Sequence, residues 1–295
     1  MEQRTETKPI WGQKEWFEKQ LVLNPLSSGS YFAHGKNGYQ LVRHNKLVNL
    51  FSRYCYSSGR LKVLDVGCGL GDLSIKILNC LDDGSQLVGY DFVEGLVELA
   101  RERYPRHKFL VGSLGHIDEK KESFDVIICS EVLYYLNDAD RQLALDNLYE
   151  MLRPNGFLIF TSRLDDGSKY FEKTAAVDAI SSRFSIFVID LSHYRIFNVI
   201  HSSANKLSRA LAILKHNQEF RVEFVKKHLP NIPSSVRSAL CYSTGFLAWI
   251  GGRPTFWLLE KILSSTALPK LSGSLGKLLG TRATNITVIA QKVAD

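Results

Sequence analysis

The sequence of 295 residues has little cysteine and lacks long apolar runs. Its five cysteines form no C-x-x-C pair, which excludes a disulfide framework and a zinc site, and we expect buried thiols in a reducing compartment. The charged first 20 residues lack the apolar segment of a secretory signal. The charge-free stretch 238–252 has 15 residues, whereas a membrane-spanning helix needs about 20. We therefore expect a cytoplasmic protein that is soluble or lies on a membrane surface.

The composition is that of a globular protein, but its charge is unevenly distributed. Hydrophobic residues make up 45% and charged residues 23%, which excludes a disordered chain. The formal net charge is +7, yet residues 1–150 carry −3 and residues 151–295 carry +10. A slightly acidic first half and a strongly basic second half indicate two separate tasks in one chain.

Apolar strand-like runs alternate with helical patterns through the middle of the sequence. The runs lie at 62–66, 86–90, 108–111, 124–129 and 157–161, and the helical patterns at 40–56, 70–80, 93–104 and 138–152. This alternation predicts an α/β fold with a mostly parallel, Rossmann-like sheet covered on both faces. Further strand-like runs at 184–189 and 285–290 are expected to complete seven strands.

These patterns predict four parts of the chain. We expect an N-terminal arm or lid at 1–39, a core at 40–190, a basic helical insertion at 191–281 and the last core strand at 282–295. Within the first part, residues 1–30 are expected to be a polar arm that contains Trp11, Trp16 and Phe17.

A glycine-rich turn follows the first strand, in the run VLDVGCGLGD at 63–72. Glycine allows the sharp turn and lets a ligand approach the backbone. The spacing G-x-G-x-G differs from the dinucleotide spacing G-x-G-x-x-G. Asp65 and Asp72 would repel a phosphate, so the turn indicates a ligand with a cationic amino-acid tail.

This run resembles the first motif of class I S-adenosylmethionine (SAM) dependent methyltransferases, and the resemblance covers roughly residues 40–165. It implies that Asp91 accepts the ribose hydroxyls of SAM. The family usually has an acid or asparagine at the position of Ser113, so Ser113 Oγ or the backbone of Leu114 must replace that contact. The implied cofactor-binding residues are Asp65, Gly67, Cys68, Gly69, Gly71, Asp91, Phe92, Ser113, Leu114, Ser130 and Glu131.

The runs SEVLYYL at 130–136 and LRPNG at 152–156 look most like those of small-molecule methyltransferases. Locally they are similar to the rhizobial Nod-factor N-methyltransferases, which act on a sugar amine. The Asn-Pro-Pro-Tyr type tetrapeptide of nucleic-acid amino-methylating relatives is absent, which argues against methylation of bases.

Methyl transfer to oxygen or to a protonated amine benefits from a base near the acceptor. The candidates are His34, Tyr39, Tyr134, Tyr135 and His193, with no metal expected. For the two consecutive tyrosines, packing is the competing interpretation. Arg43 or His44 could meet the SAM carboxylate, although an exposed helix face is the expected place for both.

The basic insertion is expected to determine the acceptor. It could cover a pocket for an anionic or lipid-linked small molecule, lie on an acidic membrane, or be a solvated cap. Nucleic acid is not expected, because the basic residues are scattered. The leading hypothesis is methyl transfer to O or N of a specialised metabolite or glycan-type acceptor. The alternatives are C-methylation of an apolar, prenyl or lipid-linked substrate, and a SAM-binding regulatory protein without turnover.

Overall fold

The structure is a computed structural model, and most of the predicted basic insertion at 191–281 lies outside the residues that it describes. Described are residues 13–23, 38–55, 59–114, 117, 119–194 and 282–293, with isolated positions at 233, 235, 236, 261, 267, 270, 271, 274 and 278. The chain divides into two compact units. The first comprises Met1–Leu21, Arg43–Arg195 and Gly273–Asp295, and the second comprises Val22–Val42 and Ile196–Ser272.

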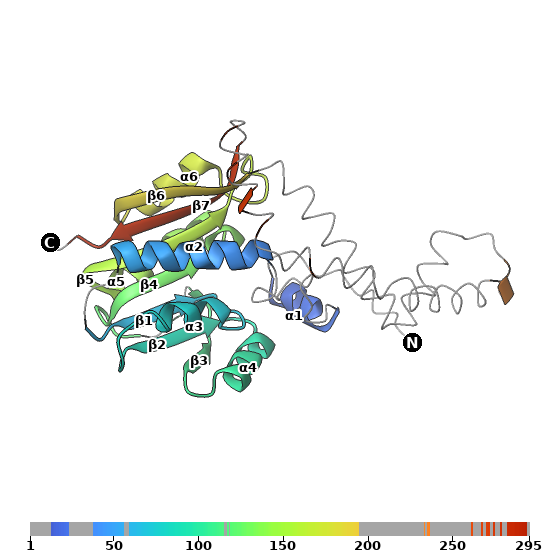
Figure 1. Cartoon of the computed structure of the whole chain (residues 1–295), viewed down its shortest axis with the longest axis horizontal. Coiled ribbons are helices and arrows are strands. Elements are labelled where there is room, and N and C mark those ends of the chain that lie inside the picture. Colours follow the sequence, from blue (N-terminus) through green and yellow to red (C-terminus); the bar gives the residue numbers. More distant parts are fainter. Residues whose placement is uncertain are drawn as a thin grey trace. The chain divides into compact units, whose positions relative to one another are not determined.

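A seven-stranded sheet of order β3-β2-β1-β4-β5-β7-β6 organises the first unit (Figure 1). Its strands are β1 (Lys62–Val66), β2 (Gln86–Asp91), β3 (Lys108–Val111), β4 (Phe124–Ser130), β5 (Leu152–Arg163), β6 (Ser185–Tyr194) and β7 (Ala283–Gln291). Neighbours from β3 to β5 pair in parallel, and β7 is antiparallel to both β5 and β6. The predicted Rossmann-like, mostly parallel sheet of seven strands is confirmed.

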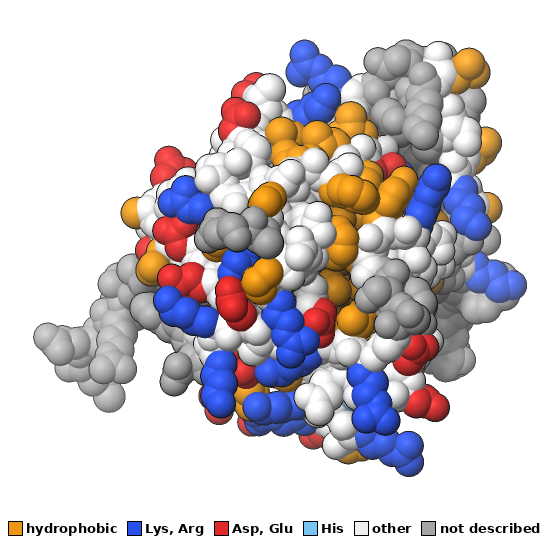
Figure 2. Space-filling model, turned by 90° about the vertical axis from the view of Figure 1, so that its left-hand side faces the viewer, with side chains coloured by type: hydrophobic (Ala, Val, Ile, Leu, Met, Phe, Trp, Pro, Cys, Tyr) orange, Lys and Arg blue, Asp and Glu red, His pale blue; other side chains and the backbone are white. Residues whose placement is uncertain are grey.

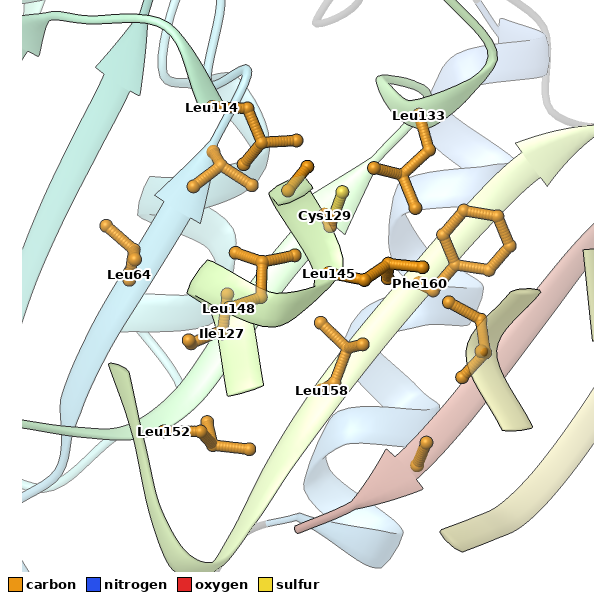
Figure 3. Close-up of a cluster of buried hydrophobic side chains, with 14 of the residues drawn as sticks. Leu64, Leu114, Ile127, Cys129, Leu133, Leu145, Leu148, Leu152, Leu158 and Phe160 are labelled. Carbon is orange, nitrogen blue, oxygen red and sulfur yellow. The ribbon is translucent and has the colours of Figure 1, made fainter. Parts of the chain in front are cut away.

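Helices cover both faces of this sheet. On one face α2 (Gly38–Tyr54), α3 (Asp72–Leu78) and α4 (Glu94–Arg103) bury side chains such as Phe51 and Ile77 in a common core. On the other face α5 (Asp138–Met151) and α6 (Lys173–Ser181) pack onto a second core. Figure 3 shows this second core, in which Leu145 and Leu148 of α5 meet Ile127 and Leu158 of the sheet. The central strands are therefore buried on both sides, whereas Phe187 and Ile189 of the edge strand β6 are exposed.

Helix α1 (Lys14–Leu23) lies where the sequence predicts a polar arm. Its Phe17 is 6% exposed, while Lys14 and Glu18 form an exposed i,i+4 pair with 3.7 Å between Nζ and Oε1. A single buried ring on a short polar helix gives almost no periodic signal, which explains why the pattern misses it.

Two further expectations differ from the structure. Strand β5 begins at Leu152, which pairs with Phe124, whereas the sequence predicts a strand only from 157; the intervening residues form a register shift inside the strand. Its irregular backbone is visible at Asn155, which has a φ of 63°. Among the described cysteines, Cys80 is exposed and not buried as expected.

The described surface carries charges of both signs. Figure 2 shows Lys and Arg side chains interspersed with Asp and Glu on the face that it presents, with apolar side chains between them. Within the described ranges, every helix is too short or too polar to cross a bilayer. In the same ranges, His, Cys, Asp and Glu side chains form no group of three or more that could hold a metal ion.

Candidate functional site

The turn between β1 and α3 is built on three glycines with positive φ. Gly67, Gly69 and Gly71 have φ values of 71°, 53° and 76°, which residues other than glycine rarely adopt. A Cβ on Gly67 would lie 2.2 Å from Cγ2 of Val132, so the turn packs tightly against the segment after β4. A Cβ on Gly69 would meet no atom of the described residues within 4 Å. The backbone at Gly69 therefore borders open space, into which a ligand can fit.

The acid predicted to bind the ribose, Asp91, ends β2 and faces this turn. Its Oδ2 accepts a hydrogen bond from the Gly69 N–H at 2.9 Å, and its Oδ1 accepts one from the Val93 N–H, also at 2.9 Å. The side chain is buried, and burial raises the pKa of Asp91 while the backbone hydrogen bonds oppose that rise. Each carboxylate oxygen can accept a further bond, so the group can still receive two hydroxyls.

Asp65, the acid inside β1, stabilises the turn by connecting β1 to α3. It is 2% exposed, and its Oδ2 accepts a hydrogen bond from the hydroxyl of Ser74 in α3. Burial raises the pKa of Asp65 to about 7, and nearby Asp91 adds to the rise while the Ser74 bond opposes it. Cys68 is buried in the turn, and burial raises its thiol pKa well above the ordinary value. Both side chains hold the turn in shape from within.

At the end of β3, the two predicted adenine contacts point to different environments. Leu114 is buried in the second core, whereas Ser113 is exposed at the strand end. The N–H of Gly112 donates to the Asp91 carbonyl oxygen at 3.0 Å, which keeps this segment beside Asp91. Ser113 is therefore the one of the two whose side chain is accessible to a ligand.

A buried polar network lies at the end of β4. Glu131 has a φ of 63°, and its Oε1 pairs with Nη1 of Arg43 at 2.6 Å, with side chains 12% and 7% exposed. The Tyr134 hydroxyl donates to Glu131 Oε2 at 3.2 Å. Asn285 Nδ2 and Thr161 Oγ1 donate to Oε1 at 3.4 Å and 3.5 Å. The carboxylate is thus fixed by donors from α2, β5, β7 and the turn after β4.

The burial of this network corrects one prediction and adds residues that the sequence analysis missed. Arg43 and His44 are 6% and 2% exposed, so the expectation of an exposed helix face for them is wrong. Their helix turns this face toward Glu131 instead of toward water. Thr161 and Asn285 carry no sequence signal for the site, because Thr161 reaches it through the pairing of β5 with β4, and Asn285 through the pairing of β7 with β5.

Aromatic rings surround the same strand end. Tyr134 and Tyr135 belong to the short 3-10 helix η2 (Leu133–Tyr135), with their ring centroids 4.5 Å apart. Tyr170, in the loop after β5, meets Tyr134 edge-on at 4.9 Å. The Nη1 of Arg163 donates to the Tyr170 hydroxyl at 3.2 Å, and burial raises the pKa of Tyr170. Tyr170 is a further residue of the site that the sequence pattern did not indicate.

The structure brings most of the predicted residues to one edge of the sheet. The carboxyl ends of β1, β2 and β4 lie side by side there. At these ends or directly after them lie the glycine turn, Asp91, Phe92, Ser130, Glu131, Tyr134 and Tyr135. Ser130 pairs through its Oγ with Thr161 Oγ1 at 2.8 Å. His34 lies outside the described residues, and Tyr39 and His193 are described only as parts of α2 and β6. These three residues remain predictions.

Comparison with known proteins agrees with this geometry. The family described as "Methyltransferase domain" matches residues 63–156. Fumosorinone synthetase of Cordyceps fumosorosea is 30% identical over 54% of this chain and 4% of its own length. Nodulation protein S of Rhizobium tropici is 31% identical over 52% of this chain and 63% of its own. The chain thus matches less than two thirds of either relative. Malonyl-[acyl-carrier protein] O-methyltransferase of Serratia marcescens is 28% identical over 34% of this chain and 38% of its own.

Solved structures share the fold at low identity. The [4+2]-cyclase SpnF has a TM-score of 0.52 and 13% identity, covering 85% of this chain and 81% of its own. A putative sarcosine dimethylglycine methyltransferase from Galdieria sulphuraria has a TM-score of 0.51 and 12% identity, covering 95% and 98%. These two likenesses concern the fold alone. Residues 63–156 thus match a methyltransferase domain, and the sheet order and the glycine turn facing Asp91 agree with the Rossmann-like fold of class I SAM-dependent methyltransferases.

Proposed function

We propose that this protein transfers the methyl group of SAM to a nitrogen or oxygen atom of a small-molecule acceptor. The observation that carries the proposal is the buried Asp91 carboxylate, held 2.9 Å from the Gly69 N–H beside the open space over that glycine. The two oxygens of the Asp91 carboxylate can accept hydrogen bonds from a neutral diol. The backbone of Gly69, which has no side chain, lets the ligand that carries the diol approach closely. A phosphate would meet unfavourable charge here.

The residues of the first three strands fit such a cofactor. SAM supplies a methyl group on a positively charged sulfur, which a displacement reaction transfers without a metal. Asp91 would hold the ribose hydroxyls, Ser113 and the backbone at Leu114 would border the adenine, and the glycine turn would lie along the amino-acid tail. The Asp91 carboxylate, when ionised, makes this end of the sheet negative, which favours a cationic ligand.

The acceptor is expected beside η2, at the ends of β4 and β5. The Tyr134 hydroxyl donates to Glu131 Oε2 at 3.2 Å, which fixes the position of its oxygen at this strand end. A polar group held in this way favours an acceptor with an N–H or O–H group over an apolar carbon nucleophile. Tyr134 would orient the acceptor for in-line attack, which lowers the barrier through positioning. The relatives named for O-methylation and the Nod-factor resemblance are consistent with this choice.

The charge of the acceptor is inferred from the sequence. Residues 151–295 carry a net charge of +10, which favours an anionic acceptor or contact with an acidic membrane surface. In the described part, Arg163 and Lys169 lie over the Tyr170 ring, with Arg163 Cζ at 4.9 Å and Lys169 Nζ at 5.6 Å from its centroid. The carboxylate of Asp165 accepts N–H groups of the same loop. Its negative charge offsets part of the positive charge of Lys169.

Two measurements test the proposal. Isothermal titration with SAM and with its demethylated product, S-adenosylhomocysteine (SAH), is expected to show binding of both. Methyl-labelled SAM is then incubated with the protein and a small-molecule extract, and the labelled product is identified by mass. A labelled amine or ether supports the proposal, and a new carbon–methyl bond contradicts it. Binding without any labelled product would favour a regulatory role, and no binding of either nucleoside would refute the cofactor assignment.

A further inference from the structure

Helix α1 lies outside the matched methyltransferase domain and contacts residues on both sides of the glycine turn. The sheet order β2-β1-β4 places the end of β1, and with it the glycine turn, between the ends of β2 and β4. Phe92 directly follows β2, and Tyr135 ends the 3-10 helix after β4. A side chain that touches both of these rings therefore bridges the strand ends on either side of the glycine turn.

Phe17 of α1 makes this connection. Its ring centroid lies 5.4 Å from that of Phe92 and 5.2 Å from that of Tyr135, edge-on in both cases. The ring is 6% exposed, and Trp16 packs against it at 5.0 Å. These contacts bury an aromatic ring across the point where the ligand-binding loops meet.

A second contact fixes the direction of the helix. A Cβ added to Gly95, in the first turn of α4, would lie 2.9 Å from Cδ2 of Leu21. Leu21 therefore packs on the β2 side, one helical turn beyond Phe17. Figure 1 shows α1 beside the carboxyl ends of the parallel strands, away from the face where the chain ends. The helix thus crosses from the loop after β4 to the start of α4.

We propose that Phe17 is a cofactor-contacting residue and that α1 forms the roof of the SAM site. The inference rests on the proposed function, because it assigns the ligand between Asp91 and Tyr135 to SAM or SAH. With the ligand bound, the Phe17 ring covers it and excludes water from the space over Gly69. Since the ring bridges Phe92 and Tyr135, α1 must separate from one of them before the ligand can enter or leave. The helix therefore controls how long the ligand stays bound.

The test compares SAH binding by three full-length variants with the unaltered protein. Phe17→Ala removes the ring, Phe17→Leu keeps an apolar side chain, and Glu18→Ala is the matched control on the exposed side of the same helix. Titration calorimetry gives the Kd, and displacement of labelled SAM by excess unlabelled SAH gives the dissociation rate of SAM. We expect Phe17→Ala to weaken SAH binding about tenfold, mainly through faster dissociation. Phe17→Leu should fall between, and Glu18→Ala should match the unaltered protein.

Trp16 provides a readout that does not depend on activity. Its indole is expected to change emission when SAH binds, and Trp16→Phe identifies that part of the signal. Far-UV circular dichroism checks that each variant is folded. If Phe17→Ala does not fold, the comparison is made with Phe17→Leu. Folded variants at Phe17 with unaltered Kd and dissociation rate would overturn the role of α1 and leave the proposed function intact. If the unaltered protein does not bind SAH, the proposed function fails and this inference fails with it.

Discussion

Two carboxylates at the same edge of the sheet are held in opposite ways. Asp91, at the end of β2, receives backbone N–H groups from Gly69 and Val93. Glu131, after β4, is paired with the buried guanidinium of Arg43. The first arrangement leaves oxygen atoms that can bind a neutral diol, and the second fixes the Tyr134 hydroxyl. In the proposed function, the β2 side binds the cofactor and the β4 side orients the methyl acceptor.

The largest expected effect comes from breaking the ion pair on the β4 side. Arg43→Met leaves Glu131 buried without its cation, which should destabilise the fold by about 3–5 kcal/mol. Chemical denaturation followed by circular dichroism measures the loss. Combining Arg43→Met with Glu131→Gln removes both charges and should recover much of the stability. A double variant no more stable than the single one would show that the pair does not act as a unit.

A pH effect follows from Asp65. Burial raises its pKa from 3.8 to about 7, so the folded state holds a proton that the unfolded state has released in this range. The folded form is therefore favoured at low pH, and this contribution is lost as the pH rises from about 4 to 7. The loss should be about 4 kcal/mol, because the pKa shift from 3.8 to about 7 spans about three units and one unit corresponds to about 1.4 kcal/mol.

The measurement for Asp65 is the free energy of unfolding between pH 4 and pH 8, for the unaltered protein and for Asp65→Asn. The variant cannot titrate at this position, so the difference in stability between the two proteins should shift in its favour as the pH rises. Asp83→Asn, at an exposed acid in the loop before β2, is the control. Parallel pH curves for the protein and Asp65→Asn would contradict the assignment.

A smaller effect, confined to turnover, is expected on the acceptor side. Tyr134→Phe removes the hydroxyl that Glu131 orients but keeps the ring contacts with Tyr135 and Tyr170. We expect methyl transfer to the identified acceptor to fall about ten- to a hundredfold, with SAH affinity within about twofold. Tyr149→Phe, at a half-buried ring on α5, is the matched control. A loss of SAH affinity equal to the loss of turnover would place Tyr134 on the cofactor side instead.

The local order of strands and helices was predictable, because it is written in short-range patterns. The apolar runs at 62–66 and 108–111 coincide with β1 and β3. The glycine turn and Asp91 were also predictable, because each follows directly from its own strand. In these cases the side chain and the element that positions it are neighbours in the sequence.

The remaining features depend on contacts between distant segments. The buried face of α2 could not be chosen from its sequence, since Arg43 is polar and yet faces Glu131, 88 residues later. Asn285 reaches the same carboxylate from the last strand. Likewise, α1 is stabilised by the contacts of Phe17 with Phe92 and Tyr135, which lie far from the helix in the sequence. Such features required the tertiary structure.

The central claim is that Asp91 binds the ribose of SAM, and one titration tests it most directly. SAH is titrated into the unaltered protein, into Asp91→Asn and into the control Asp83→Asn. Asp91→Asn keeps the size of the side chain but removes the charge and one acceptor, so its Kd should rise at least tenfold, about 1.5–3 kcal/mol. The control should bind as the unaltered protein does. Equal SAH affinity for all three proteins, with Asp91→Asn folded, would contradict the account.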